Sequence, residues 1–217
     1  MTSEFDIQYV PKQMAVFTTI LDDHVQFNKY MKDVIFNHRR EHPETTKSNV
    51  RAWHSSWVTH HENPNFQPLV DLTLDACSFI TNGYYEGGDD IEYNVINLWA
   101  MMYEDTEWTK KHSHFPSDYA ACYYVDVEPG CAPVIFESVQ KDGVNDNNQP
   151  LTLQPQNGML AIWPAILHHE VPPTKGRRMC VSMNIEKGPM STHHDKQKEM
   201  GYDVDRNKST NDIWKTS

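Results

Sequence analysis

Residues 111–116 read Lys-His-Ser-His-Phe-Pro, and residues 120–125 read Ala-Ala-Cys-Tyr-Tyr-Val. The second segment is apolar and aromatic, which is typical of a buried β-strand. Side chains two positions apart on an extended chain point to the same face, so His112 and His114 can converge on one point. Neutral imidazole binds iron, zinc, copper or nickel, and the pair is therefore a candidate part of a metal site. Hydrogen-bonded surface histidines are the alternative interpretation.

Short apolar runs extend from this histidine pair in both directions. Gly, Pro and Asn residues, which favour turns, separate these runs. Several short strands between such turns indicate a β-sandwich or a barrel. The predicted strands are residues 91–102, 120–127, 134–136, 151–153, 159–163, a short one around 171, and 178–185.

The N-terminal part of the chain has a different pattern. Apolar residues recur at helical spacing in residues 22–41 and 66–82, and residues 14–17 fit a short first strand. Pro43 is expected to end the first helix, and Gly83 the second. The sequence thus predicts helices first and a β-rich half after them.

These patterns predict an α+β, mainly β fold in a single domain, residues 1–190. The domain divides into a helix-rich part, residues 1–90, and a β core, residues 91–187. Residues 191–217 are polar, carry charges of both signs and lack an apolar stripe, so we expect them to form a C-terminal tail.

Composition limits the classes of partner. The chain has 217 residues and a formal net charge of −11, which argues against a broad nucleic-acid or anionic-membrane surface. No apolar run is long enough to span a bilayer, and residues 1–10 lack the features of a secretory signal, so the predicted location is cytoplasmic. The four cysteines form no CxxC pair, and we expect them to be buried free thiols.

The run from Arg178 to Ile185 reads Arg-Met-Cys-Val-Ser-Met-Asn-Ile and alternates between two faces of a strand. Arg178, Ser182 and Asn184 share one face with Cys180, and apolar residues occupy the other. An arginine on such a strand is costly to bury without a partner, and its guanidinium matches a carboxylate with two hydrogen bonds. The carboxylate comes either from the 30 Asp and Glu residues of the chain or from a ligand.

Five segments in order resemble the 2-oxoglutarate and Fe(II)-dependent oxygenases, and most closely a prolyl-hydroxylase-like branch that occurs in marine bacteria and their phages. The resemblance covers about residues 90–187, and a weaker similarity extends it to the segment from Ser48 to Trp57. It implies a double-stranded β-helix core of the jelly-roll or cupin-like kind, with the N-terminal helices packed outside it. The segments are the HxH pair before Tyr-Tyr-Val at 123–125, Pro-Gln-Asn-Gly at 155–158, Met-Leu-Ala-Ile-Trp-Pro at 159–164, Leu-His-His-Glu-Val-Pro-Pro at 167–173, and the run 178–185.

Members of this superfamily usually bind iron through an HxD motif and a distant histidine. Here His112 and His114 occupy the HxD positions, so His114 stands where the acid is expected. The resemblance implies that His112, His114 and His169 bind the metal. The alternatives that stay open are an acid at Asp118 or Glu137 in place of His114, and His168 in place of His169.

The resemblance also implies a binding site for the co-substrate. Arg178 matches the residue that binds the distal carboxylate of 2-oxoglutarate, and Tyr124 matches a tyrosine that assists it. Tyr123 is the alternative to Tyr124, because the sequence does not decide which of these two adjacent residues lies on the face of the strand that points to Arg178. Ser182 shares the face of Arg178 and can add a hydrogen bond. A packing role is the alternative for Tyr124 and for Ser182.

The function implied is that of a 2-oxoglutarate-dependent Fe(II) dioxygenase, which couples decarboxylation of 2-oxoglutarate to C–H hydroxylation. Its cofactors would be Fe(II) and 2-oxoglutarate, and its substrate a small molecule, a peptide or a protein, with prolyl hydroxylation favoured. Two other functions are considered. A cupin-like three-His metalloenzyme would not need Arg178 for a co-substrate. A non-catalytic β-helix module with a degenerate metal site would bind no stoichiometric iron.

Overall fold

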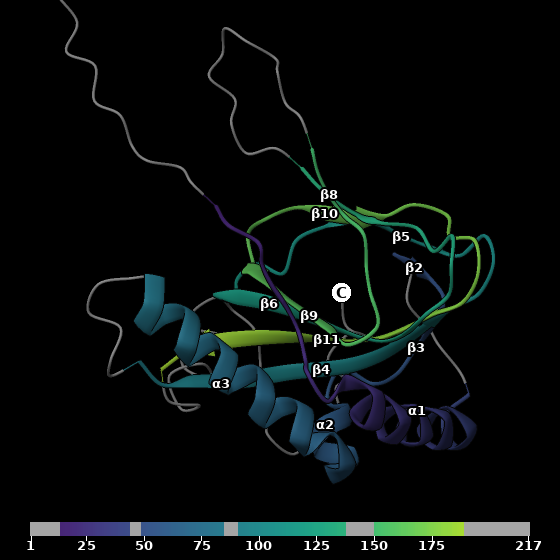
Figure 1. Ribbon diagram of the computed structural model, residues 1–217, viewed down its shortest axis with the longest axis horizontal. Helices are drawn as coiled ribbons and strands as arrows, with labels where there is room; N and C mark the ends of the chain where they lie inside the picture. The colour runs from purple at the N-terminus through teal and green to yellow at the C-terminus, as the bar shows by residue number, and fades with distance from the viewer. Residues whose placement is uncertain (1–13, 44–48, 85–90, 138–149, 189–217) are drawn as a thin grey trace, which may run out of the picture.

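The computed structural model describes residues 14–43, 49–84, 91–137 and 150–188. Two facing antiparallel sheets form the centre of this part of the chain (Figure 1). The strands are β1 (Phe17–Ile20), β2 (Val50–Arg51), β3 (Trp53–His54), β4 (Tyr93–Tyr103), β5 (Trp108–His112), β6 (Tyr119–Val127), β7 (Val134–Phe136), β8 (Leu151–Leu153), β9 (Met159–Pro164), β10 (His169–Val171) and β11 (Arg178–Lys187).

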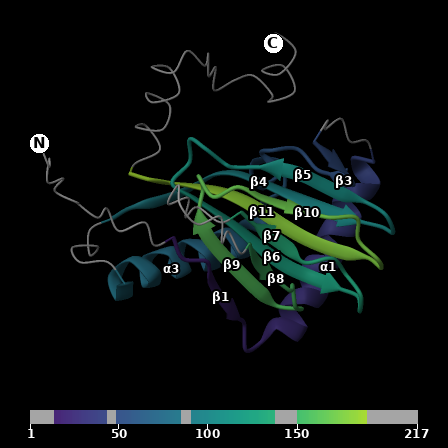
Figure 2. The ribbon, with the colours of Figure 1, turned by 90° about the horizontal axis from the view of Figure 1, so that it is seen from above.

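The larger sheet has the strand order β1-β9-β6-β11-β4-β3, and the smaller sheet has the order β2-β5-β10-β7-β8. Seen from above, the smaller sheet overlies the larger one (Figure 2). A core of apolar side chains fills the space between the two sheets, including Trp99, Phe136, Trp163 and Leu167. This arrangement is the double-stranded β-helix that the sequence resemblance predicts.

Helices cover the outer face of the larger sheet (Figure 1). They are α1 (His24–Glu41), the short α2 (Thr59–Glu62), the 3-10 turn η1 (Pro64–Phe66) and α3 (Gln67–Tyr84). In α1 the buried apolar residues Met31, Val34 and Ile35 recur at helical spacing, and they pack on the sheet in a second core cluster. The predicted helices at 22–41 and 66–82 are therefore confirmed to within about two residues. No helix of the described chain is both long and apolar enough to cross a membrane.

Strand β11 lies at the centre of the larger sheet, between β6 and β4, and both of its faces are buried. Met179, Val181 and Met183 join the core under the helices. Cys180 joins the core between the sheets. The two-faced pattern read from the sequence is therefore confirmed, and it directs the polar face of β11 into the space between the sheets.

The sequence did not predict β2, β3 or β5. Strand β5 reads Trp-Thr-Lys-Lys-His, and only Thr109 in it is buried. Its pairing with β10 shifts register between His169 and Val171, so the inside–outside alternation is interrupted. Lys110 and Lys111 of β5 are exposed, and such a strand carries little hydrophobic signal. Strands β2 and β3 and the short helix α2 lie in residues 50–62, for which the sequence predicted no strand or helix.

The Pro-Gln-Asn-Gly turn before β9 is present as predicted. Gly158 has a φ of +79°, and a Cβ atom added there would lie 2.3 Å from the Cβ of His24. Its N–H donates to the carbonyl of Tyr124 at 2.8 Å. Only glycine fits this position, where the N-terminus of α1 meets the adjacent strands β6 and β9.

The four cysteines, Cys77, Cys122, Cys131 and Cys180, are buried free thiols, as the sequence predicts. The predicted tail at 191–217 lies outside the described residues.

Candidate functional site

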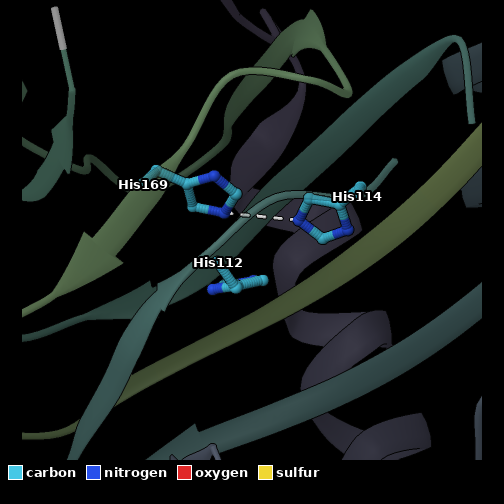
Figure 3. A group of neighbouring side chains, drawn as sticks. All are labelled: His112, His114 and His169. Atoms are coloured by element: carbon cyan, nitrogen blue, oxygen red, sulfur yellow. Dashed lines mark hydrogen bonds between the residues drawn. The ribbon is translucent and has the colours of Figure 1, made fainter. Parts of the chain in front are cut away.

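Three histidines from two adjacent strands meet between the sheets (Figure 3). His112 ends β5, and His169 opens β10 directly opposite it in the ladder. His114 follows β5 in a turn, and its backbone N–H donates to the carbonyl of Ala165 at 2.7 Å. One ligand nitrogen from each ring lies within 4.8 Å of the others. The pair named from the sequence and the distant His169 therefore form one cluster.

Hydrogen bonds fix the tautomer of each ring. The Nδ1 atom of His112 lies 2.8 Å from the carbonyl of Lys110, and that of His169 lies 3.1 Å from the carbonyl of Leu167. The Nδ1 atom of His114 lies 2.7 Å from Oδ1 of Asn184. A carbonyl oxygen only accepts, so each Nδ1 carries the proton, and each Nε2 presents a lone pair.

The lone pairs fit a metal ion. Nε2 of His114 lies 3.3 Å from Nε2 of His169 (Figure 3), yet neither nitrogen has a proton to donate to the other. Two nitrogens at right angles on one metal, each about 2.1 Å from it, lie about 3 Å apart. The close approach of two bare lone pairs is unfavourable without a cation between them. The donor set is three neutral nitrogens, which suits iron and other first-row metals.

Burial keeps the three rings neutral. Burial and, to a smaller extent, the neighbouring His112 lower the pKa of His114 to about 3, while the hydrogen bond to Asn184 opposes the shift. Burial also lowers the pKa of His112 and, with the two neighbouring rings, holds the pKa of His169 well below its usual value. At neutral pH the lone pairs are therefore available without loss of a proton.

The alternative ligands lie elsewhere. His168 is exposed and is not part of the cluster. Asp118 accepts the backbone N–H of Lys187 at 2.8 Å, and Glu137 pairs with Lys111 at 3.5 Å. The structure therefore brings together the three histidines and leaves out the acids considered in their place.

Arg178 is almost completely buried, with 2% of its surface exposed. Its Nη1 donates to the carbonyl of Ala132 at 3.3 Å, and its Nη2 donates to the hydroxyl of Tyr124 at 3.4 Å. Its guanidinium also lies over the rings of Tyr103 and Tyr124. Among the described residues, Nε has no hydrogen-bond partner and no carboxylate forms an ion pair with Arg178. The neighbouring Arg177 is different, because it pairs with Asp126 and Glu128 at the surface.

The structure separates the two tyrosines that the sequence left open. Tyr124 contacts Arg178 in the space between the sheets, and burial raises its pKa well above the usual value, so it stays a neutral hydroxyl. The hydroxyl of Tyr123 points to the opposite side, where it donates to Asn28 of α1 at 2.6 Å. Ser182 is buried on the pocket side, as the strand pattern predicts.

One pocket contains all of these groups. The three histidines, Arg178, Tyr124 and Ser182 line it together. No Asp or Glu is among the described residues that line the pocket, so its only fixed charge is the positive charge of Arg178. Such a pocket favours an anionic ligand at one end and a cation between the imidazoles at the other.

Aromatic rings form one wall beside the histidines. Trp99 stacks on His114 with ring centres 5.7 Å apart, and His54 stacks on the other side of Trp99 at 5.7 Å with an interplanar angle of 7°. Trp57 meets Trp99 edge-on at 4.3 Å. His54 and Trp57 line the pocket but were not assigned to a site from the sequence. The signal that pointed toward them was the aromatic run from Trp53 to Trp57.

A family model described as “Putative 2OG-Fe(II) oxygenase” matches residues 97–184. The match runs from β4 to β11 and contains the three histidines and Arg178. A comparison with curated protein sequences finds no match.

Solved structures share the fold at low sequence identity. A prolyl-4-hydroxylase from Pseudomonas putida is 12% identical with a TM-score of 0.57, and the alignment covers 81% of this chain and 94% of that chain. A viral collagen prolyl hydroxylase from Paramecium bursaria Chlorella virus-1, solved with 2OG, is 12% identical with a TM-score of 0.55, covering 79% and 96%. The non-heme alpha-ketoglutarate-dependent epimerase SnoN from nogalamycin biosynthesis is 13% identical with a TM-score of 0.57, covering 78% and 76%.

At these identities the likeness shows the fold and not the reaction. A hydroxylase and an epimerase share the same architecture, so the chemistry has to be argued from the residues of the pocket.

Proposed function

We propose that this chain is a hydroxylase that acts on a prolyl residue of a peptide or protein. By its family match and its histidine triad it is a 2-oxoglutarate/Fe(II)-dependent oxygenase, and Fe(II) and 2-oxoglutarate are its expected cofactors. The observation that carries the proposal is a single pocket with three imidazole lone pairs at one end and a buried, unpaired arginine at the other. The HxH pattern also leads us to infer kinship with the prolyl-hydroxylase-like branch described above.

In this proposal each polar group of the pocket has a separate task. His112, His114 and His169 would bind Fe(II) through Nε2. Arg178 would bind the distal carboxylate of 2-oxoglutarate, with the hydroxyl of Tyr124 beside it and Ser182 as a further donor. The charge of Arg178 would thereby gain the partner that the described residues do not provide.

When bound, the iron and 2-oxoglutarate supply the oxidation, in which one oxygen atom of O₂ enters the substrate C–H bond and the other enters succinate as CO₂ leaves. The chain supplies position and surroundings. Its neutral imidazoles need no deprotonation, its arginine orients the co-substrate, and its aromatic wall keeps water away from the reacting atoms.

The aromatic wall supports a neutral substrate group. Trp57 is half-buried at the pocket, whereas Trp99 is 3% exposed and packs behind it. A prolyl ring is flat-sided and apolar, and it packs well on an indole face. A lysyl or arginyl side chain would require a carboxylate, and the described lining residues contain none.

The two alternative functions predict different behaviour of the same pocket. A three-His metalloenzyme without 2-oxoglutarate would have no use for a buried arginine aimed at the pocket. A non-catalytic module would have no use for three rings whose tautomers all direct lone pairs to one point. Both features favour the oxygenase.

Anaerobic titration with Fe(II) and 2-oxoglutarate tests the proposal. We expect a weak visible charge-transfer band that needs both components, and succinate after air is admitted together with a proline-containing peptide. Matched peptides with alanine or lysine at the proline position serve as controls, and the product peptide should gain one oxygen atom. If neither the band nor succinate forms, the oxygenase assignment is wrong. If both form but the alanine and proline peptides react alike, the prolyl assignment is wrong.

A further inference from the structure

His114 differs from its two partners in what holds its ring. His112 and His169 donate to backbone carbonyls two residues away on their own segments. His114 donates to the side chain of Asn184, which lies 70 residues later in the chain. His114 is therefore the one ring of the triad whose Nδ1 donates to a side chain, and this acceptor can be removed by mutation.

A second amide supports Asn184. Its Nδ2 donates to Oδ1 of Asn97 at 3.1 Å, and the two residues face each other across the β4–β11 ladder. Because the amino group of Asn184 is occupied by Asn97, its oxygen faces Nδ1 of His114. The hydrogen bonds thus run in one direction along Asn97, Asn184 and His114.

Strand β4, which carries Asn97, also supplies a side chain that packs on the face of the His114 ring. Trp99 lies two residues after Asn97 on β4, on the same face, and stacks on His114 with an interplanar angle of 23°. His169 stacks on His114 with an interplanar angle of 8°. The stacking fixes the plane of the ring, and the hydrogen bond to Asn184 then selects which nitrogen faces the other imidazoles.

We propose that Asn184, oriented by Asn97, is a positioning residue that holds His114 in the Nδ1–H tautomer with Nε2 directed at the metal position. The inference concerns the orientation of His114 in the folded chain, and only its consequence for metal affinity rests on the proposed function. An amide orients the ring as a carboxylate would, but it adds no negative charge. His114 stands at the position where the 2-oxoglutarate/Fe(II) oxygenases usually have an acid. With Asn184 as its hydrogen-bond partner, this position brings no negative charge to the metal site.

Nuclear magnetic resonance of histidine ring nitrogens in the metal-free protein tests the proposal directly. We expect the wild type to show His114 as the Nδ1–H tautomer, Asn184→Ala to show a mixture or the other tautomer, and Asn184→Asp to restore the wild-type tautomer. Asn94→Ala is the matched control, because Asn94 lies on β4 with Asn97 but donates to the carbonyl of Gly188, away from His114. An unchanged tautomer in Asn184→Ala would overturn the inference.

Metal titration gives a second and independent measurement. Replacement of a residue that orients a metal ligand typically lowers metal affinity by about 10- to 100-fold, and we expect a loss in this range for anaerobic Fe(II) with Asn184→Ala. Asn97→Ala should give a smaller loss, and Asn184→Asp should bind at least as tightly as the wild type. If Asn184→Ala does not fold, Asn184→Asp and Asn97→Ala still decide the question. Equal affinities in all folded variants would show that Asn184 has only a packing role.

The two proposals fail in different ways. A wild-type protein that binds no Fe(II) but keeps the Nδ1–H tautomer contradicts the proposed function and leaves the role of Asn184 intact. A protein that binds iron and turns over 2-oxoglutarate with the same tautomer in wild type and Asn184→Ala contradicts only the inference about Asn184.

Discussion

At the triad end of the pocket each imidazole has a hydrogen-bond acceptor for Nδ1 at 2.7–3.1 Å, whereas at the Arg178 end the guanidinium has only neutral partners at 3.3 and 3.4 Å. His114 also stacks on His169 and on Trp99, while Nε of Arg178 has no partner among the described residues. The triad end is thus organised in the folded chain itself. The arginine end carries a buried charge that has no carboxylate partner among the described residues.

This difference suggests that the two ends respond differently to mutation. At the triad end, a substitution removes a lone pair that nothing else replaces. At the arginine end, a substitution removes a buried charge that we propose binds the co-substrate. The experiments below separate the two ends, from the largest expected effect to the smallest.

The largest effect is expected from His114→Ala, which removes one of three metal-binding nitrogens. We expect Fe(II) affinity to fall by more than about 100-fold, because removal of a direct ligand should exceed the loss caused by removal of an outer residue. His114→Asp supplies an oxygen donor at the same place and should still bind iron. His168→Ala, next to the triad but exposed, is the control and should bind like the wild type. Anaerobic equilibrium titration measures all three, and full iron binding by His114→Ala would remove His114 from the proposed ligand set.

Arg178→Gln is expected to have the next largest effect, on 2-oxoglutarate and not on iron. Loss of one partner from a buried charge pair costs about 2–5 kcal/mol, which corresponds to at least about a 30-fold weaker binding of 2-oxoglutarate. Arg177→Gln removes a neighbouring arginine that pairs with surface acids, and it should leave binding unchanged. Titration of the charge-transfer band with 2-oxoglutarate gives both affinities. Equal affinities of the two variants would favour a metalloenzyme that does not use 2-oxoglutarate.

The stability of the metal-free protein should fall as the pH falls below about 6.5. In this range the histidines of the unfolded chain become protonated, whereas the buried histidines of the folded chain stay neutral. The pKa of His169 in the folded chain lies well below its value in the unfolded chain. The contribution of neutral His169 to the free energy of unfolding is therefore fully present above pH 6.5, and it is progressively lost as the pH falls toward the pKa of the folded state. We expect His169→Gln to reduce the loss of unfolding free energy between pH 7.5 and pH 5 by about 2 kcal/mol.

Urea unfolding of metal-free protein at the two pH values measures this difference. His168→Gln is the matched control, because His168 adjoins His169 in sequence but is exposed. We expect it to keep the pH dependence of the wild type. Identical pH dependence in His169→Gln and wild type would mean that His169 is not buried as a neutral ring.

The smallest effect is expected from Trp57→Ala, at the substrate side of the pocket. Loss of one aromatic packing surface should lower kcat/KM for a proline-containing peptide by about tenfold. The affinity for 2-oxoglutarate should stay unchanged, because Trp57 packs on Trp99, whereas the guanidinium of Arg178 contacts Ala132 and Tyr124. Val25→Ala, at an exposed position of α1, is the control. A peptide kcat/KM unaffected by Trp57→Ala would place the substrate elsewhere.

Much of the fold could be predicted where buried strands carry a continuous apolar signal. Strands β4, β6, β9 and β11 are buried on both faces, and their predicted ends agree with the structure to within about two residues. Strand β5 was missed because its lysines face outward and a register shift interrupts its alternation. Short strands at the rim of a sheet depend on their neighbours for hydrogen bonds and leave little trace in local composition.

The candidate site shows a similar division. His112, His114, His169 and Arg178 could be named from spacing and resemblance. Tyr124 could not be separated from Tyr123, because a shift of one residue in strand parity exchanges the two faces. His54 and Trp57, which line the pocket, and Asn97, which contacts Asn184, could not be assigned, since each is brought to its place by contacts between segments distant in sequence.

The sequence by itself determined the order of elements, the two faces of β11 and the residue types able to hold a metal and a carboxylate. These properties are local, because they follow from side-chain chemistry and from the two-residue repeat of a strand. Only the tertiary structure decided that β10 lies beside β5, that Arg178 has no carboxylate partner in the described chain, and that Asn184 orients His114. Each of these depends on which strands become neighbours, and strand pairing is a contact between parts of the chain that the local sequence does not encode.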